Sequence, residues 1–171
     1  MSKREVKPAK IIAGCGILTA LGVVIMLLGA VIGIGTYLAP LIAGGSLLLV
    51  RRTYGVKYQV IAWLAVGILS LMLVPALEQN LMFLCLFGCY PIFWPYLQRL
   101  NRVLRLGIKL VYFNAVFISI ELLLMLLIVP EAIDSLLFVL LVLLGNVVFL
   151  AYDAVLPKLE RLMTHLLGKF L

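Results

Sequence analysis

Long stretches of this chain carry no charged side chain. Such runs cover Ile11–Val50, Tyr58–Leu77, Gln79–Gln98 and Ser135–Tyr152, and a fifth stretch, Leu110–Pro130, is interrupted only by Glu121. A helix that crosses the hydrocarbon core of a bilayer, which is about 30 Å thick, needs about 20 mainly apolar residues. The pattern therefore predicts a polytopic integral membrane protein built from apolar helices.

The first uncharged run is too long for one crossing. It holds 40 residues, which as a single helix would extend about 60 Å, twice the thickness of the hydrocarbon core. The sequence Gly33-Ile34-Gly35-Thr36 interrupts the run, and Pro40 follows at a place suited to the first turn of a second helix. We therefore predict six helices, over about 11–33, 37–53, 57–76, 79–97, 107–129 and 133–155, followed by an amphipathic tail, 157–171.

The basic residues sort onto one side of the membrane if the N-terminus is cytoplasmic. The segments 1–10, 51–57, 96–109 and 156–171 then lie inside and hold all 14 Lys and Arg residues. The outer loops hold Glu78, Glu131 and Asp134 and no basic residue. A single first helix would instead place 10 of the 14 outside, against the positive-inside rule. We therefore predict one all-α transmembrane domain, 1–171, with six helices and both termini cytoplasmic, in a bacterial cytoplasmic membrane.

The composition excludes other classes of protein. Hydrophobic residues make up 65% of the chain and charged residues only 12%, whereas a soluble domain has about half and about a quarter. A soluble globular enzyme, a disordered chain and a nucleic-acid-binding protein are therefore excluded. The excess of basic residues, a net charge of +7, reflects membrane topology more than an anionic partner.

Recognisable catalytic and metal-binding motifs are absent from the sequence. It contains one histidine, His165, and none of the common nucleophile, zinc or phosphate-loop patterns. Its three cysteines, Cys15, Cys85 and Cys89, all lie in apolar stretches without neighbouring metal ligands. We expect no enzymatic activity, no metal and no cofactor.

Two cytoplasmic segments are amphipathic. Arg99, Arg102, Arg105 and Lys109 recur at nearly helical spacing with leucines between them, and the tail 157–171 presents an apolar face opposite its charges. One interpretation is a pair of interfacial helices on anionic lipid. The other is a surface that docks a cytoplasmic partner subunit.

Polar side chains mark the last two predicted helices. From a rise of about 1.5 Å per residue, Asn114 and Asn146 lie at the same depth, so we expect a hydrogen bond that clamps these helices together. Asp153 lies near the inner interface, where an interfacial anchor or an ion pair with Lys158 is expected.

Glu121 lies deeper, in the outer half of the membrane and among Leu and Ile residues. An ionised carboxylate facing lipid is costly, so Glu121 should face the interior of the bundle or a cavity, or be protonated. Ser70, on the third predicted helix, lies at a comparable depth and is a candidate partner for Glu121. We consider a ligand site at Glu121, Ser70, Glu78, Gln79 and Asn80 beside the alternative of a neutral, hydrogen-bonded packing role for Glu121.

Small residues line one face of the first helix. Ala13, Gly16 and Ala20 share this face in its cytoplasmic half, and Gly29 and Gly33 form a G-x-x-x-G pattern near its outer end. Such faces let another helix approach closely. Packing within the bundle is one interpretation, and docking of another subunit is the other.

Three short motifs resemble a group of short bacterial membrane proteins. They read FGCYPI at 87–92, KLVYFN at 109–114 and NVVFLAYD at 146–153, and that group carries FG-x-YPI, KL-x-YFN and NVVF-x-x-YD in the same order. The resemblance covers about residues 11–155 and implies no activity.

More distantly, the layout resembles the S components of energy-coupling-factor vitamin transporters, which have six helices and cytoplasmic termini. The resemblance implies capture of a small molecule from outside and docking of a transmembrane coupling subunit through the first helix, with ATPase subunits supplying energy. That family carries an A-x-x-x-A face there, where this chain has Ala13, Gly16 and Ala20.

Three hypotheses follow. The chain is a solute-binding transporter subunit of this kind, or a stand-alone carrier, self-associating or not, in which Glu121 binds a proton. In the third hypothesis it is an accessory or structural membrane subunit whose polar residues serve packing alone.

Overall fold

In a computed structural model of the protein, the structure describes residues 8–32, 35–127 and 135–170, the last eight of these by their backbone alone. Every regular element in these ranges is a helix. In chain order they are α1 (Pro8–Val31), α2 (Gly35–Tyr54), α3 (Val56–Leu73), α4 (Leu77–Leu81), the π-helix η1 (Met82–Phe87), α5 (Tyr90–Leu97), α6 (Arg102–Leu127) and α7 (Ser135–Phe170).

The all-helical class predicted from the sequence is confirmed within these ranges. Five stretches are long and apolar enough to cross a membrane: Ala9–Val31, Val56–Leu73, Leu77–Leu97, Arg102–Leu126 and Leu136–Leu162. The sixth predicted crossing, 37–53, corresponds to α2, which is not among the five; its last turn carries Arg51 and Arg52 and its interior contains Pro40. Pro40 was expected in the first turn of this helix and lies further inside it, because α2 begins at Gly35. Gly33, the second glycine of the predicted G-x-x-x-G pattern, lies outside the described residues.

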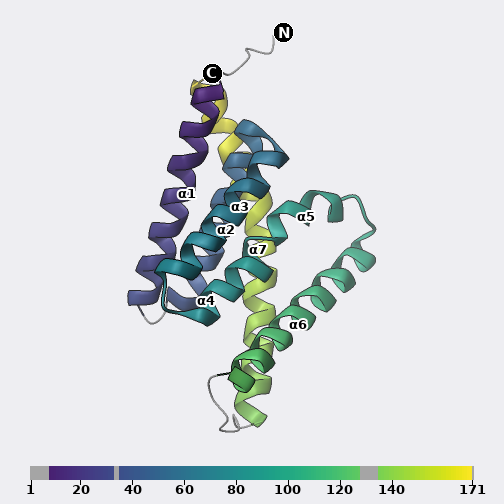
Figure 1. The fold of residues 1–171 in the computed structure, drawn as a ribbon. Coiled ribbons are helices and arrows are strands. Elements are labelled where there is room, and N and C mark those ends of the chain that lie inside the picture. Colours follow the sequence, from purple (N-terminus) through teal and green to yellow (C-terminus); the bar gives the residue numbers. More distant parts are fainter. Residues whose placement is uncertain (1–7, 33–34, 128–134, 171) are drawn as a thin grey trace.

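The helix α2 lies at the centre of the bundle. It packs against α1, α3, η1, α4, α5 and α7, and its buried positions are mostly small or aliphatic, such as Ala39, Ala43, Gly44 and Leu47. One hydrophobic cluster joins α1, α2 and α3, and a second, aromatic cluster joins η1, α5, α6 and α7. Figure 1 shows the start of α1 and the end of α7 at the same end of the molecule.

The predicted helix 79–97 is broken in the structure. A short α-helix passes into the π-helix Met82–Phe87, and a turn at Gly88 separates this from α5. Pro91 and Pro95 both lie in α5. Pro91 is in the first turn, where a missing N–H costs no helical hydrogen bond, whereas Pro95 lies inside the helix and removes one. A Cβ at Gly88 would lie 2.7 Å from the carbonyl oxygen of Phe83, so the turn requires glycine.

The predicted last helix, 133–155, and the predicted tail, 157–171, are not separate in the structure. A single helix, α7, runs from Ser135 to Phe170 with Pro157 in its interior, so the predicted tail continues the last transmembrane helix. Residues on both sides of Pro157 hold the helix in place, because Leu156 is fully buried and Leu159 packs against the same aromatic cluster. This packing compensates for the hydrogen bond that proline cannot donate. The predicted tail histidine, His165, has a side chain outside the described residues.

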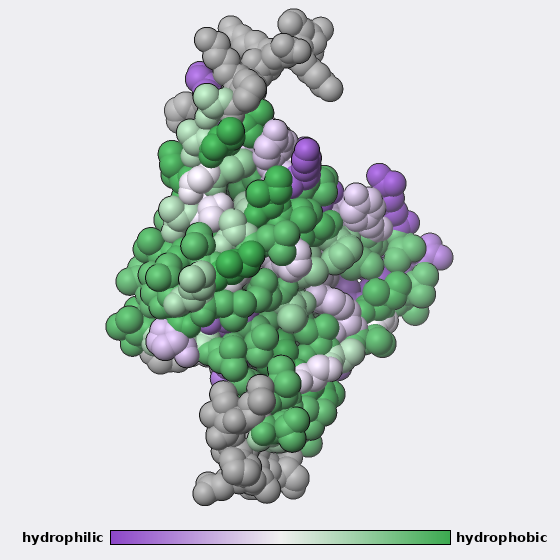
Figure 2. Space-filling view, in the orientation of Figure 1, coloured by the Kyte–Doolittle hydropathy of each residue, from purple (hydrophilic) through white to green (hydrophobic). Residues whose placement is uncertain are grey.

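The surface of the molecule is mainly apolar. Figure 2 shows hydrophobic residues over most of one face, with the most hydrophilic groups in the upper part of the view. Among the exposed apolar side chains are Val31, Met72, Val103 and Leu126, each more than three-quarters exposed at 84%, 78%, 85% and 84%. A soluble protein rarely displays so much contiguous apolar surface, and these helices are compatible with a multi-pass membrane protein.

Candidate functional site

Polar side chains of α2 and α4 are hydrogen-bonded where these two helices begin, and a third polar side chain, from α6, lies within electrostatic range of them. The hydroxyl of Tyr37 donates a hydrogen bond to Oε1 of Glu78, at 2.6 Å. Both groups lie close enough to Glu121, on α6, to interact with its carboxyl group electrostatically. We call Tyr37, Glu78 and Glu121 the acidic cluster.

Glu121 is the buried member of the acidic cluster. Its residue is only 7% exposed, and its Oε1 atom has no hydrogen-bond donor among the described residues. A buried carboxyl oxygen without a donor loses its hydration and gains nothing in return, which costs stability. This free acceptor makes Glu121 the strongest candidate for contact with a ligand or a proton.

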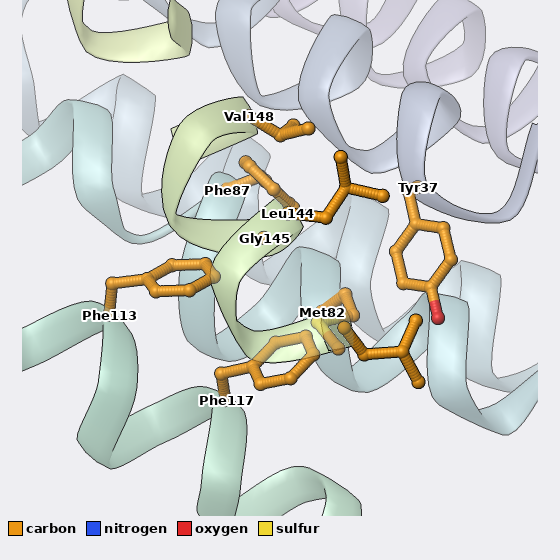
Figure 3. Close-up of a pocket in the computed structure, with 9 residues that line it drawn as sticks. Tyr37, Met82, Phe87, Phe113, Phe117, Leu144, Gly145 and Val148 are labelled. Carbon is orange, nitrogen blue, oxygen red and sulfur yellow. The ribbon is translucent and has the colours of Figure 1, made fainter. Parts of the chain in front are cut away.

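An apolar cavity of about 90 Å³ lies beside the acidic cluster. Figure 3 shows Phe113 and Phe117 of α6 on one side of it and Tyr37 of α2 on the other, with α7 between them. Met82 also lines the cavity and lies one helical turn after Glu78. Phe117 lies one helical turn before Glu121. The two carboxylates do not line the cavity, and Tyr37, which lines it and donates to Glu78, connects the cavity with the acidic cluster.

The other three predicted ligand residues are buried and make hydrogen bonds to the backbone. Ser70 donates to the carbonyl of Gly67 at 3.0 Å, Gln79 to that of Met26 at 2.6 Å, and Asn80 to that of Val74 at 3.0 Å. These bonds hold α4 to α1 and close the end of α3. The proposed contact between Ser70 and Glu121 is thus replaced by a bond within α3.

Tyr37 was not among the site residues predicted from the sequence. A tyrosine near the start of a membrane helix is typical of the interfacial belt, and nothing in its sequence neighbourhood connects it with Glu78 or Glu121. Only the packing of α2 against α4 brings the phenol to the carboxylate.

The predicted contact between Asn114 and Asn146 is present. Each amide donates to the other's oxygen, at 3.1 and 2.9 Å, and each also donates to a carbonyl one turn earlier on its own helix, Leu110 or Val142. The pair joins α6 to α7 with no free donor left over, which fits a packing clamp.

Asp153 is not paired with Lys158 as expected. One carboxylate oxygen accepts from Nζ of Lys109 and the other from the hydroxyl of Tyr90, both at 2.5 Å. Lys109 is 4% exposed, so it is not part of a solvated basic face. Three helices, α5, α6 and α7, are joined through this one carboxylate.

The predicted docking face on α1 is exposed. Ala13, Gly16 and Ala20 all lie on the surface, and a Cβ at Gly16 would meet no atom within 4 Å. Packing within the chain uses a different face, where a Cβ at Gly29 would lie 2.2 Å from that of Ala39. The two patterns of small residues thus have different surroundings.

Within the described residues, no group of three His, Cys, Asp or Glu side chains is arranged to hold a metal ion. No protein-family model, curated protein or solved structure matches this chain. The site must therefore be interpreted from its own chemistry.

Proposed function

We propose that this protein is a solute-binding membrane subunit of a transporter, similar in layout to an S component, that takes a small ligand at the acidic cluster. The observation that carries the proposal is the buried Glu121 carboxyl group, whose Oε1 atom has no hydrogen-bond donor among the described residues and which lies within electrostatic range of Glu78 and Tyr37. The protein crosses a bacterial cytoplasmic membrane six times, as a single transmembrane domain with both termini inside.

The position of α2 supports the sixth crossing. Its 20 residues span about 30 Å, the thickness of the hydrocarbon core. Because its neighbours surround it on several sides, its small and polar residues face other helices and need not be as hydrophobic as a lipid-facing helix. The alternation of helix directions then leaves the basic segments on the cytoplasmic side.

The chemistry of the site defines the class of ligand. The wall of the cavity is apolar, while Glu121 and Glu78 offer acceptors and negative charge. A small molecule with an apolar body and an ammonium or other donor group matches both. Such a ligand would supply the donor that Glu121 lacks.

Partner subunits would dock on the exposed small-residue face of α1. Ala13, Gly16 and Ala20 are exposed, and a Cβ at Gly16 would meet no atom of the described residues within 4 Å; small residues let another membrane helix approach closely. Coupling and ATPase subunits would supply the energy, as the resemblance to S components implies.

Native mass spectrometry of the protein purified in mild detergent tests the ligand site. We expect a small-molecule adduct on the wild type that is lost in Glu121→Gln, because the amide replaces an acceptor oxygen and removes the charge. Glu160→Gln is the matched control, since Glu160 pairs with Arg52 away from the acidic cluster, and it should keep the adduct. An adduct present equally in all three proteins would place the ligand elsewhere.

A second function, a stand-alone carrier linked to proton movement, is favoured by the burial of Glu121, whose Oε1 atom has no hydrogen-bond donor among the described residues, since carboxyl groups inside membrane proteins commonly bind and release protons. Isolated protein in liposomes would then accumulate a permanently charged, membrane-impermeant ammonium probe, such as tetraethylammonium, only under a pH gradient, and protein-free liposomes would not accumulate it. Uptake unchanged in Glu121→Gln would remove Glu121 from this role, and no uptake at all would leave the subunit function.

A further inference from the structure

A second cavity, of about 320 Å³, lies where α5 ends and α6 begins, against α7. Its polar lining consists of Gln98, Arg102, Arg105, Lys109 and Asp153. The volume is within the range of about 300–1,000 Å³ that is usual for small-molecule sites. This cavity is separate from the acidic cluster and shares no lining residue with the apolar cavity.

The charges that line this cavity do not cancel. The carboxylate of Asp153 already forms an ion pair with Nζ of Lys109, at 2.5 Å, and accepts a hydrogen bond from the hydroxyl of Tyr90. Arg105 donates to the neutral oxygen of Gln98 at 2.6 Å, and no ion pair with a carboxylate of the described residues is found for Arg102 or Arg105. Two guanidinium groups therefore give the cavity an excess of positive charge.

The chemistry of these groups selects an anion with several oxygens. A guanidinium group presents a planar fork of N–H donors that matches a phosphate in bidentate geometry. Arg102 is also the first residue of α6, a helix of 26 residues, whose N-terminal end favours negative charge. The guanidinium groups and the N-terminal end of α6 therefore favour an anion at the same end of the cavity.

The surface beside the cavity is apolar. Leu106 of α6, which lines the cavity, is 49% exposed, and Val103, which follows Arg102 in the same helix, is 85% exposed. A phosphate attached to acyl chains would therefore find its headgroup in the cavity and its chains along α6. A soluble organic phosphate would use the same guanidinium groups without the apolar face.

We propose that the cavity formed by the end of α5, the start of α6 and α7 binds a phosphate group through Arg102 and Arg105. This site does not depend on the ligand proposed for the acidic cluster.

The test compares Arg102→Gln/Arg105→Gln with the control Arg99→Gln/Arg161→Gln, which removes two exposed basic side chains that do not line the cavity. Full-length proteins in neutral detergent are titrated with phosphatidylglycerol and phosphatidylcholine of matched chains in native mass spectrometry. Inorganic phosphate and glycerol 3-phosphate are titrated by calorimetry. Circular dichroism checks the helix content of each variant.

Loss of two charge-assisted contacts should weaken phosphate binding at least about tenfold in the cavity variant and leave the control near the wild type. Preference for phosphatidylglycerol with this pattern identifies a lipid headgroup, and binding of the soluble phosphates with this pattern identifies a soluble ligand. Equal losses in both double variants, or no binding of any phosphate probe by the wild type, would overturn the proposal. If the double variant loses helix content, Arg102→Lys keeps the charge without the fork, and binding as tight as in the wild type would also overturn it.

Discussion

At the scale of single residues, the carboxylate of Asp153 has the most consequential surroundings. It is the shared acceptor for a lysine that is almost fully buried and for a tyrosine hydroxyl. A buried lysine is tolerated where its charge is paired and its hydrogen bonds are made. The burial of Lys109 is therefore conditional on Asp153, although the two are 44 positions apart.

Removing one partner of this pair should be much worse than removing both. We expect Lys109→Met and Asp153→Asn each to destabilise the protein by about 3–5 kcal/mol, because each leaves an uncompensated buried group. The double variant should recover a large part of that loss. Unfolding in mixed detergent micelles measures the cycle, with the exposed Lys57→Met as control. Losses that simply add would show that the two groups do not interact.

At the scale of elements, the π-helix meets α2 and α7 at one point. A Cβ on Gly44 would lie 2.1 Å from the carbonyl oxygen of Phe87, and that oxygen accepts a hydrogen bond from Tyr152 at 3.1 Å. The glycine thus permits contact between a helix backbone and the end of η1. This close approach positions Phe87 at the apolar cavity.

Gly44→Ala should therefore force α2 and η1 apart. We expect a loss of about 1–3 kcal/mol, typical of overpacking, measured as a lower midpoint of unfolding in detergent. Gly107→Ala is the matched control, since a Cβ there meets no atom within 4 Å and alanine favours the helix by about 1 kcal/mol. A Gly44→Ala protein as stable as the Gly107→Ala protein would contradict this account of the contact.

At the scale of the whole molecule, the question is whether α2 crosses the membrane. Five stretches qualify by length and composition, and an odd number of crossings would place the termini on opposite sides. Yet the start of α1 and the end of α7 lie at the same end of the molecule (Figure 1). The crossing that we propose for α2 would make the number of crossings even, in agreement with this arrangement of the ends.

Reporter fusions decide the number of crossings. A fluorescent protein that folds only in the cytoplasm should be bright when fused to either terminus, and alkaline phosphatase, which is active only outside, should be inactive at both. Alkaline phosphatase inserted between Ile34 and Gly35 should be active. Brightness at one terminus alone would mean an odd number of crossings and would remove the assignment of the acidic cluster to the outer side.

The contacts that could be predicted from the sequence are those that depend only on the spacing of residues along a helix or on their depth in the membrane. Asn114 and Asn146 could be matched because a helix rises by a constant distance per residue, and the structure brings them together. The partners of Asp153 and Ser70 could not be predicted in this way. Asp153 pairs with Lys109 and not with Lys158, and Ser70 donates to Gly67 and not to Glu121. These choices depend on how the helices rotate and tilt against each other.

The sequence by itself determined that the chain is helical and that several of its helices can cross a membrane, because hydrophobicity and charge act residue by residue. Only the tertiary structure decided that Tyr37, Glu78 and Glu121 lie together, that Lys109 is buried, and that α7 continues through Pro157. Those outcomes depend on contacts between residues far apart in the chain, whose energies exceed the local preferences that a sequence pattern displays.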